Sequence, residues 1–332
     1  MIELKGKSVM ITGGAGFIGS HLVDRLILEQ PSNLVVVDNL FLGKESNLDK
    51  AKQDYPELKI YHQDATDCKA MEKIIKNEGI QVVFNLAVVP LPISLSHPKW
   101  SFNQNVDITL CLCELARTGL YNTLIHFSSS EAYGTCQYSP MDESHPLNPT
   151  TPYAASKAAC DMLVLSYIHT FGIDASIVRP FNQYGPRQND GNYAGVIPLT
   201  IKRIMLGAAP VVYGDGEQVR DFLYVRDTVD ATVKIYRYPE TRGRIVNIGS
   251  GKEVSINTIV ERIVLYMDCD KPVLYQEVAR PGDVRRHIAG IELAGELIGF
   301  EPTVDLEEGL RITIDWYKAI YCRRPIGLPK MP

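Results

Sequence analysis

The sequence predicts an α/β fold in which a doubly wound parallel sheet is joined to a smaller mixed α/β C-terminal lobe. Two observations predict it. Through the first half of the 332 residues, short apolar runs alternate with helix-like stretches, as in parallel sheets with crossover helices. After residue 179 this alternation stops, and glycines and prolines interrupt a stretch with few long periodic elements.

The expected strands of the sheet are apolar runs of four or five residues. They lie at residues 8–12, 34–37, 59–62, 82–86, 124–128 and 175–179. The helices between them are expected at 18–30, 70–77, 101–118 and 153–171. Ligands of such a sheet bind beyond the carboxyl ends of its strands, so site residues should follow these runs.

The second half should return to the sheet once before it completes the smaller lobe. A helix at 226–236 and a buried strand at 245–248 are expected to rejoin the sheet. Further helices are expected at 256–266, 291–297 and 306–319. We therefore expect one domain of residues 1–180, to which 224–249 return, and a second lobe of residues 181–223 and 250–332.

Composition excludes several classes of partner. The chain is 45% hydrophobic and 22% charged with a formal net charge of −5, so nothing indicates nucleic acid or an anionic membrane surface. Its most apolar stretch, 80–95, is broken by Asn85, Pro90 and Pro92, which argues against a membrane span. The N-terminus lacks the layout of a signal peptide, so we expect a cytoplasmic protein.

The seven cysteines are scattered along the chain and form no Cys-x-x-Cys pair. No cluster of histidines and cysteines has the spacing of metal ligands, so no metal is expected. Reduced thiols in a cytoplasmic protein are the simplest interpretation.

A glycine-rich turn follows the first expected strand. The glycines at 13, 14, 16 and 19 stand between that strand and a helix, in the order that a dinucleotide site requires. Glycines let the backbone approach a pyrophosphate, and the helix N-terminus supplies amide donors. Asp38 ends the next strand, nineteen residues after Gly19, where a carboxylate accepts hydrogen bonds from an adenosine ribose. That carboxylate would repel a 2′-phosphate, so NAD is favoured over NADP.

Tyr153 and Lys157 stand four residues apart on an expected helix and therefore share a face. A nearby ammonium favours the phenolate and should lower the pKa of Tyr153. The pair is thus a candidate general base for a substrate hydroxyl. Tyr-x-x-x-Lys also occurs by chance in helices that only pack, so the pair needs support from the rest of the chain.

Together these residues resemble the extended short-chain dehydrogenase/reductase family, in particular its nucleotide-sugar epimerases, dehydratases and decarboxylases. The shared motifs cover nearly the whole chain. They are TGGAGFIG at 12–19, DNL at 38–40, DA at 64–65, NLA at 85–87, SSSEAYG at 128–134, Tyr153 with Lys157, RPFNQYGPR at 179–187, GDGEQVRDF at 214–222 and RPGD at 280–283.

The resemblance implies a Rossmann domain that binds NAD and a lobe that binds a nucleoside diphosphate sugar. The implied cofactor residues are Gly13, Gly16, Phe17, Ile18, Gly19, Asp38, Asn39, Asp64, Ala65, Leu86, Ala87 and Lys157. The implied substrate residues are Asn182, Val196, Tyr213, Arg220 and Arg280. A guanidinium suits phosphate geometry, although Arg220 beside Asp221 could equally form a surface ion pair.

The resemblance also implies a first step that all its reactions share. Tyr153 takes the C4 hydroxyl proton, Ser129 holds the C4 oxygen, and C4 gives a hydride to NAD. The 4-ketone then has three fates. Return of the hydride to the opposite face inverts C4. Loss of the C5 proton and the C6 hydroxyl, followed by return of the hydride at C6, gives a 4-keto-6-deoxy sugar. A C6 carboxylate leaves as carbon dioxide.

Glu131 bears on the choice among these outcomes. Only dehydration needs a base for the C5 proton, and the 4,6-dehydratases have a hydroxyl, then Asp or Ser, then Glu where this chain has Ser129, Ser130 and Glu131. Ser130 leaves the acid for the C6 leaving group open. We therefore expect a 4,6-type dehydratase, with a UDP-sugar 4-epimerase as the alternative, because residues 185–198 also resemble 4-epimerases.

Two further outcomes are less favoured. Decarboxylases place an arginine near the position of His287, but Arg285 and Arg286 are out of register for that role. A regulatory protein that keeps the fold and loses turnover is disfavoured because Tyr153, Lys157 and Ser129 are all present. Residues 88–93 depart from all three patterns, so the sugar could be unusual. The resemblance finally implies a homodimer that pairs through helices 101–118 and 153–171.

Overall fold

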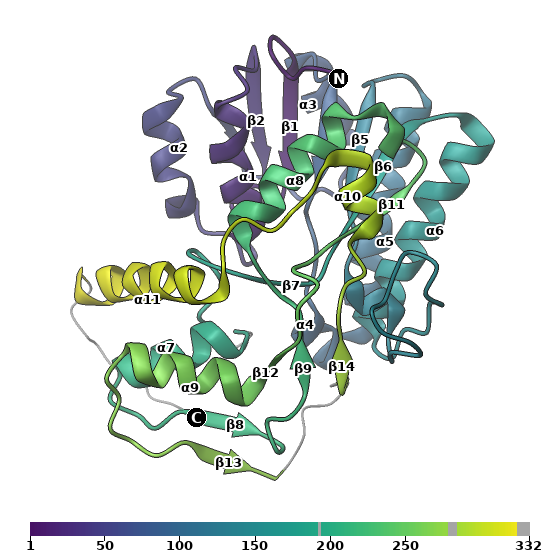
Figure 1. Ribbon diagram of the computed structural model, residues 1–332. Coiled ribbons are helices and arrows are strands. Elements are labelled where there is room, and N and C mark those ends of the chain that lie inside the picture. Colours follow the sequence, from purple (N-terminus) through teal and green to yellow (C-terminus); the bar gives the residue numbers. More distant parts are fainter. Residues whose placement is uncertain (192–193, 278–283, 324–332) are drawn as a thin grey trace.

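In the computed structural model, which describes residues 1–191, 194–277 and 284–323, seven parallel strands form one sheet. They are β1 (Ser8–Thr12), β2 (Asn33–Val37), β3 (Lys59–Tyr61), β4 (Val82–Asn85), β5 (Thr123–Phe127), β6 (Asp174–Pro180) and β11 (Ile245–Ile248). Their order is β11-β6-β5-β4-β1-β2-β3 (Figure 1). The predicted doubly wound sheet is confirmed, and β11 returns to it beside β6 as expected.

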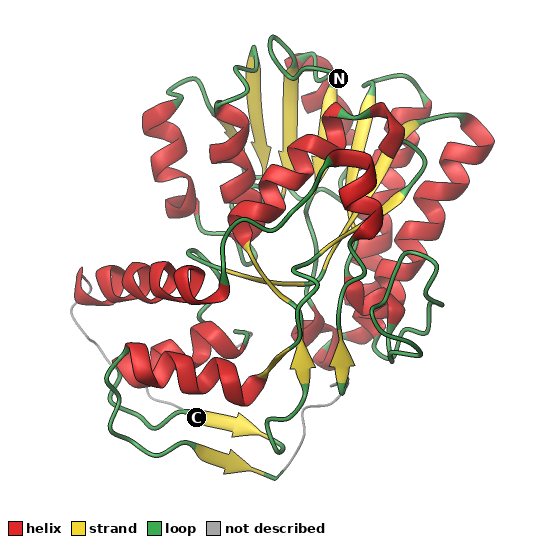
Figure 2. Ribbon diagram, in the orientation of Figure 1, coloured by secondary structure: helices red, strands yellow, loops and turns green. Residues whose placement is uncertain are grey.

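Helices cover both faces of this sheet (Figure 2). One face packs against α1 (Phe17–Ile27), α2 (Asp49–Asp54), α8 (Val225–Arg237) and α10 (Glu292–Ile298). The other face packs against α3 (Cys68–Glu78), α5 (Pro98–Arg117) and α6 (Pro152–Phe171). The division of the chain into two domains at residue 180 stays a prediction.

The strands divide their side chains between two cores because successive residues of a strand point to opposite faces. Val9 and Ile11 of β1 belong to the core under α1 and α8, whereas Met10 between them belongs to the core under α3 and α5. All three side chains are fully buried. A sheet covered on both faces therefore requires the continuous apolar runs from which it was predicted.

Beyond the carboxyl ends of the strands lies a smaller part with its own core. Helices α7 (Val196–Met205), α9 (Ile256–Tyr266) and α11 (Leu306–Arg323) supply most of that core. Its strands are short: β7 (Asn182–Tyr184), β8 (Val211–Tyr213), β9 (Val219–Arg220), β10 (Phe222–Tyr224), β12 (Val254–Ser255), β13 (Leu274–Gln276) and β14 (Arg286–His287). They pair as β10-β7, β12-β9-β14 and β13-β8, so segments distant in sequence lie side by side.

Several helices carry a proline in their first turn, and two of them, α4 (Leu91–Ser96) and α7, were not predicted from the sequence. Helix α4 has Pro92 at its second position, α5 begins at Pro98, and α7 carries Pro198 in its first turn. A proline is tolerated in the first turn, where the missing N–H has no helical partner in any case. Three 3₁₀ turns complete the description: η1 (Glu45–Leu48), η2 (Ser130–Tyr133) and η3 (Pro239–Thr241).

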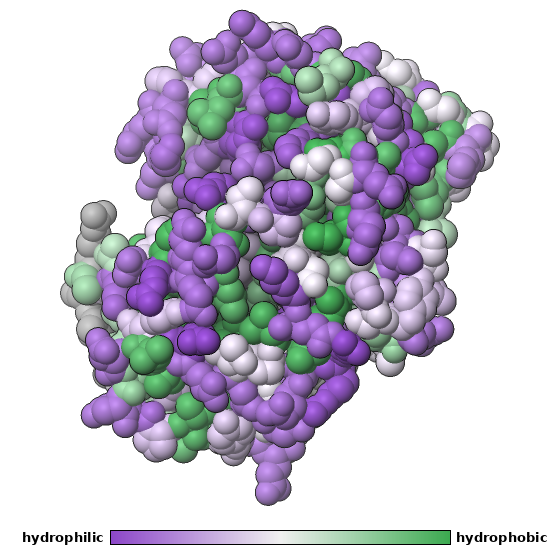
Figure 3. All heavy atoms as spheres, in the orientation of Figure 1, coloured by the Kyte–Doolittle hydropathy of each residue, from purple (hydrophilic) through white to green (hydrophobic). Residues whose placement is uncertain are grey.

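The face of the molecule in Figure 3 is mainly hydrophilic, with scattered apolar side chains. In the part of the chain that the structure describes, no helix has the length and apolar character needed to cross a bilayer.

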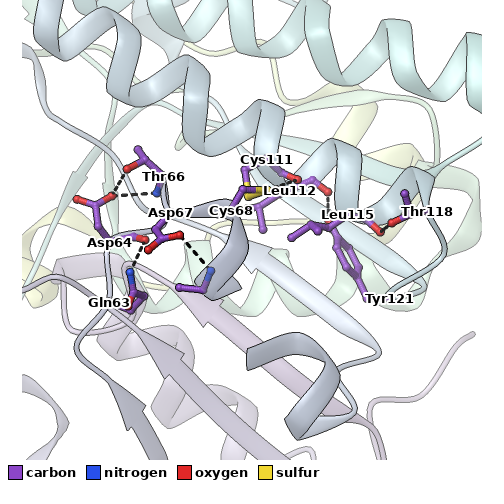
Figure 4. The surroundings of a disulfide bond; sticks show 11 residues. Gln63, Asp64, Thr66, Asp67, Cys68, Cys111, Leu112, Leu115, Thr118 and Tyr121 are labelled. Carbon is purple, nitrogen blue, oxygen red and sulfur yellow. Dashed lines mark hydrogen bonds between the residues drawn. A yellow bond between two sulfur atoms is a disulfide. The ribbon is translucent and has the colours of Figure 1, made fainter. Parts of the chain in front are cut away.

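One pair of cysteines departs from the expectation of reduced thiols. Cys68, at the start of α3, and Cys111, on α5, form a disulfide, with their Cα atoms 5.4 Å apart (Figure 4). The bond joins two helices of the same core, close to the loop that carries Asp64. Spacing could not predict it, since 43 residues separate the two cysteines.

Candidate active site

All the residues expected at the cofactor line one cavity of about 510 Å³. The cavity lies beyond the carboxyl ends of the sheet strands, whose arrowheads in Figure 1 point toward the smaller part. Ser129, Ser130, Glu131 and Tyr153, which are expected to act on the sugar, line the same cavity. The fold thus brings the predicted cofactor and catalytic residues together, while their individual roles stay predictions.

The glycine turn is built for close backbone approach. Gly13 has a φ of +69°, and a Cβ there would lie 2.8 Å from the Ala87 nitrogen. A Cβ on Gly19 would lie 2.2 Å from the Gly13 oxygen. Larger residues would therefore push the start of α1 away from β1 and β4. The N-terminal amides of α1, whose N-cap is Gly16, face the cavity and form an anion-binding site.

Asp38 follows β2 and is only 8% exposed. Its Oδ2 accepts a hydrogen bond from the Ala15 nitrogen at 2.9 Å, and its Oδ1 accepts one from the Leu40 nitrogen at 2.8 Å. Burial raises the pKa of the Asp38 carboxyl, and the two backbone bonds oppose that effect. The carboxylate is thus held rigidly against the glycine turn, as a ribose-binding residue requires.

Asn39 and Asp64 form a second polar element of the cavity. The Asn39 amide donates to Asp64 Oδ2 at 2.9 Å, and the other carboxylate oxygen accepts from the nitrogen and hydroxyl of Thr66. Burial alone would raise the pKa of Asp64, but these hydrogen bonds bring it below its ordinary value. Asp64 is therefore an ionised, fixed group beside Ala65 at the end of the cavity expected to hold adenine.

Tyr153, on α6, lines the cavity together with Ser129 and Glu131, which lie in the turn after β5. Burial raises the pKa of the Tyr153 phenol to about 12, against a lowering effect of its hydrogen bond with the Ser129 side chain. The negative charge of Glu131 raises it further. Ser129 Oγ also accepts from the Glu131 nitrogen at 3.2 Å, so the three residues form one compact group.

The prediction that the pKa of Tyr153 lies below its ordinary value is wrong for this structure, in which that pKa is raised. The Lys157 ammonium donates a hydrogen bond to the Phe127 carbonyl, and burial of the phenol dominates its titration. The shared helix face is nevertheless confirmed, because both residues lie on α6 and line the cavity. Lys157 is 5% exposed, and its burial lowers its own pKa.

The expected substrate residues surround a second cavity of about 210 Å³. Val196, Tyr213 and Arg220 line it, and Asn182 lines both cavities. Asn182 Nδ2 is buried and has no hydrogen-bond partner in the described part of the chain, so it is a donor aimed at a ligand. Arg220 is 9% exposed and donates to the Val219 carbonyl at 2.9 Å. The expected Arg280 lies outside the described residues.

His287 is the residue that sequence reasoning underrated. It is fully buried on β14, and its Nε2 lies 3.1 Å from the Ser130 carbonyl oxygen while Nδ1 lies 3.5 Å from the Ser130 hydroxyl. Burial lowers its pKa to about 3, and the nearby Arg220 lowers it further, so the ring is neutral. Neutral His287 therefore donates from Nε2 and fixes Ser130. The only sequence signal for His287 was its position directly after Arg285 and Arg286.

The two arginines before His287 point elsewhere. Arg285 bonds both carboxylate oxygens of Asp215, at 2.8 and 2.9 Å, and Arg286 pairs with Glu253. Both arginines are exposed, and neither belongs to the lining of the two cavities.

Comparisons with known proteins agree with this geometry. A family model described as GDP-mannose 4,6 dehydratase matches residues 10–313. The chain belongs to this family. Within it, a putative UDP-glucose 4-epimerase from Methanocaldococcus jannaschii is 34% identical over 311 residues, which cover 93% of this chain and 98% of the relative.

Solved structures of the same group share the fold. A UDP-N-acetylglucosamine 4-epimerase from Methanobrevibacter ruminantium, in complex with UDP-N-acetylmuramic acid, has a TM-score of 0.88 at 37% identity and covers 95% of this chain and 99% of its own. A dTDP-glucose 4,6-dehydratase from Streptomyces venezuelae with NAD and TYD bound has a TM-score of 0.87 at 28% identity, with 94% and 97% covered. Membership of the nucleotide-sugar epimerase and dehydratase group is thereby confirmed.

Proposed function

We propose that this protein is an NAD-dependent enzyme that oxidises C4 of a nucleoside diphosphate sugar and then dehydrates it, as a 4,6-type dehydratase. The observation that carries the choice of dehydration is the position of Glu131. Its carboxylate lies in the cavity with Ser129 and Tyr153 and is close enough to raise the pKa of the Tyr153 phenol. A second base at this position is needed for dehydration and for neither of the other outcomes.

The cavity fits NAD on three grounds. The glycine turn admits no Cβ, the amides of α1 face an anion site, and Asp38 is held against the turn as a ribose acceptor. The Asp38 carboxylate would repel a 2′-phosphate, which favours NAD over NADP. NAD, when bound, supplies the hydride acceptor for C4.

Tyr153 is the proposed base for the C4 hydroxyl. Its phenol is buried and bonded to Ser129, which places a donor and an acceptor beside the same substrate oxygen. Because burial raises its pKa to about 12, the phenolate requires positive charge nearby. Lys157, one turn along α6, supplies part of that charge.

Glu131 would then remove the C5 proton, which the 4-ketone has made acidic. Loss of the C6 hydroxyl completes the elimination and requires a proton donor. Glu131 itself, protonated by the first transfer, can return that proton to the leaving hydroxyl. Water leaves and a C5–C6 double bond forms. The 4-keto-6-deoxy sugar would result when the hydride taken from C4 is returned to C6 and a proton from solvent is added at C5.

A UDP-sugar 4-epimerase is the second candidate, and Ser130 is the observation that favours it. Many dehydratases have Asp at this position as the acid for the C6 hydroxyl. Here Ser130 is 4% exposed and fixed by His287, so it is poorly placed for that task. The 34% identity to a putative UDP-glucose 4-epimerase supports the same alternative.

Decarboxylation has the weakest support. It requires a cation for the substrate carboxylate, and Arg285 and Arg286 are engaged with Asp215 and Glu253 on the outside of the molecule.

One experiment separates the outcomes. The protein is incubated with UDP-glucose, UDP-N-acetylglucosamine, dTDP-glucose, GDP-mannose and UDP-glucuronate in deuterated water, and products are identified by NMR. A 4-keto-6-deoxy sugar with deuterium at C5 supports dehydration. A C4-inverted sugar without deuterium establishes the epimerase and removes Glu131 from the proposal.

We also propose a homodimer through α5 and α6. Leu110 on α5 and Met162 on α6 are 39% and 46% exposed, so each helix presents a large apolar side chain that a partner could cover. Light scattering should give twice the chain mass of 37.0 kDa, and Met162→Lys should reduce it to the monomer mass.

A further inference from the structure

A buried carboxylate lies one helical turn beyond Lys157. Tyr153, Lys157 and Asp161 stand at four-residue intervals on α6 and so share a face. Asp161 has no exposed surface, yet the steps described above do not use it. Its Oδ2 accepts hydrogen bonds from Arg179 and from Ser128 Oγ, both at 2.6 Å. Lys157 binds the carbonyl of Phe127, the residue before Ser128, so both side chains are anchored at the end of β5.

The second oxygen of Asp161 has no hydrogen-bond partner among the residues that the structure describes. Asp161 Oδ1 is buried without a hydrogen bond, and so is His126 Nε2, which lies 4.0 Å away. That separation is too long for a hydrogen bond. A buried carboxylate interacts with nearby charges more strongly than an exposed one, because the effective dielectric of the protein interior is lower than that of water.

Hydrogen bonds fix the state of the His126 ring. Thr12 donates to Asn85 Oδ1 at 2.7 Å, so the Asn85 nitrogen must donate to His126 Nδ1 at 3.1 Å. The ring proton is therefore on Nε2. Burial holds the pKa of His126 well below its ordinary value, and the charge of Lys157 lowers it further. His126 is thus neutral and brings no cation to Asp161.

Lys157 depends on a counter-charge because it is itself buried. Burial lowers the pKa of Lys157, and two neighbours on α6 oppose this, Cys160 and Asp161. Burial raises the pKa of the Cys160 thiol, so Cys160 carries no charge at neutral pH. Asp161 remains as the charged group that favours the ammonium. The titratable and charged groups around this pair are Tyr153 and Cys160 on α6, His126 on β5, Arg179 on β6 and Glu131 in η2.

We propose that Asp161 is a positioning residue for the reaction: its buried carboxylate holds Lys157 as an ammonium and sets the alkaline limit of C4 oxidation. This inference rests on the proposed function, in which Lys157 contacts NAD and supports the Tyr153 phenolate. Asp161 also raises the pKa of Tyr153 by its charge. Removing that charge should therefore move the acid and alkaline limbs of the pH profile in the same direction, toward lower pH.

The test compares the wild type with Asp161→Asn. Two quantities are followed from pH 6 to 10: turnover of the nucleotide sugar found by the panel above, and the affinity for NAD by titration calorimetry. The NAD titration needs no sugar, so it still tests Asp161 if the panel identifies no substrate. We expect the alkaline midpoint of both curves to fall by about one pH unit or more in Asp161→Asn, because loss of a nearby negative charge lowers the pKa of the Lys157 ammonium by about this amount.

Two further variants keep the test decisive. Asp161→Asn leaves the buried Arg179 guanidinium without its carboxylate, which destabilises the fold, so the double variant Asp161→Asn/Arg179→Met removes both buried charges. It should show a smaller fall in the same direction, because loss of the Arg179 cation favours the Lys157 ammonium and partly offsets the loss of Asp161. Thr109→Val is the matched control: it removes a buried hydroxyl that bonds Cys160 between α5 and α6 and changes no charge. Its midpoints should stay at the wild-type pH. Unchanged midpoints in both Asp161 variants, or an equal fall in Thr109→Val, would overturn the proposal.

Discussion

The two parts of the molecule are built by different means. In the sheet part, most neighbouring strands are consecutive in the chain and joined by one helical crossover, as β1-β2, β4-β5 and β5-β6 are, whereas β11 returns to the edge beside β6 from the second half of the chain. The smaller part is assembled from strands of two or three residues that pair across long distances, such as β9 with β12 and β14. The first is organised by local sequence pattern and the second by tertiary contacts.

The proposed catalytic and binding roles also divide between these two parts. The residues proposed to hold NAD and to move the C4 proton all come from the sheet part, in loops after its strands or on α6. The second cavity, which is proposed to hold the nucleotide, is lined by residues of the smaller part. The two meet where His287 of β14 fixes Ser130 of η2, next to Glu131. In the proposed mechanism, oxidation therefore depends on residues of one part, whereas the outcome of the reaction depends on the contact between the two.

The largest effect should come from Tyr153→Phe, which removes the base of the sheet part. We expect turnover to fall by about 1,000-fold, because a positioned general base contributes up to this order. Product formation by NMR with the best sugar of the panel measures it. Tyr167→Phe, a substitution of the same kind on the same helix, should keep the wild-type rate. A variant at position 153 with full rate would exclude Tyr153 as the base.

Glu131→Gln tests the place where the two parts meet, next to Ser130 and His287, and should have the next largest effect. Under dehydration, we expect product to fall about 100-fold while NADH accumulates, since oxidation at C4 does not need Glu131. Absorbance at 340 nm follows NADH and NMR follows the product. Undiminished product would show that the outcome is decided elsewhere, as in a 4-epimerase.

Asp38→Asn tests the cofactor side alone. It keeps the shape of the side chain but removes the charge proposed to repel a 2′-phosphate. We expect the preference for NAD over NADP to fall about tenfold, a change of about 1.4 kcal/mol. Calorimetric titrations with both dinucleotides measure it, and an unaltered preference would mean that another group excludes NADP.

His287→Gln should have the smallest effect, and we expect that effect in the free energy of unfolding and not in the turnover rate. His287 has a pKa of about 3 in the folded chain, below its unfolded value, so the unfolded chain binds more protons between these values. The stability from keeping this ring neutral is present above pH 6.5 and is lost as pH falls, by roughly 1.4 kcal/mol per pH unit. Urea unfolding at pH 7 and pH 5.5 should show a smaller difference for His287→Gln than for the wild type. Equal differences would mean that His287 is not neutral in the fold.

Most of the sheet part could be predicted because its signals are local. Apolar runs gave the seven strands to within a few residues, and the glycine turn and Asp38 follow their strands directly. The pairing of Tyr153 with Ser129 also followed from motif order. Titration could not be predicted in this way: four-residue spacing placed Lys157 beside Tyr153, but burial outweighs that charge and raises the pKa of the phenol.

The short strands, the disulfide between Cys68 and Cys111 and the contact of His287 with Ser130 have no local signal. Each joins segments whose proximity depends on how the whole chain packs. Sequence alone therefore identifies the dinucleotide cavity and the candidate base, since strand, turn and helix periodicities are short-range properties. Folding determines which of these groups are charged and that Ser130 is bonded to His287, because burial and long-range contacts control desolvation.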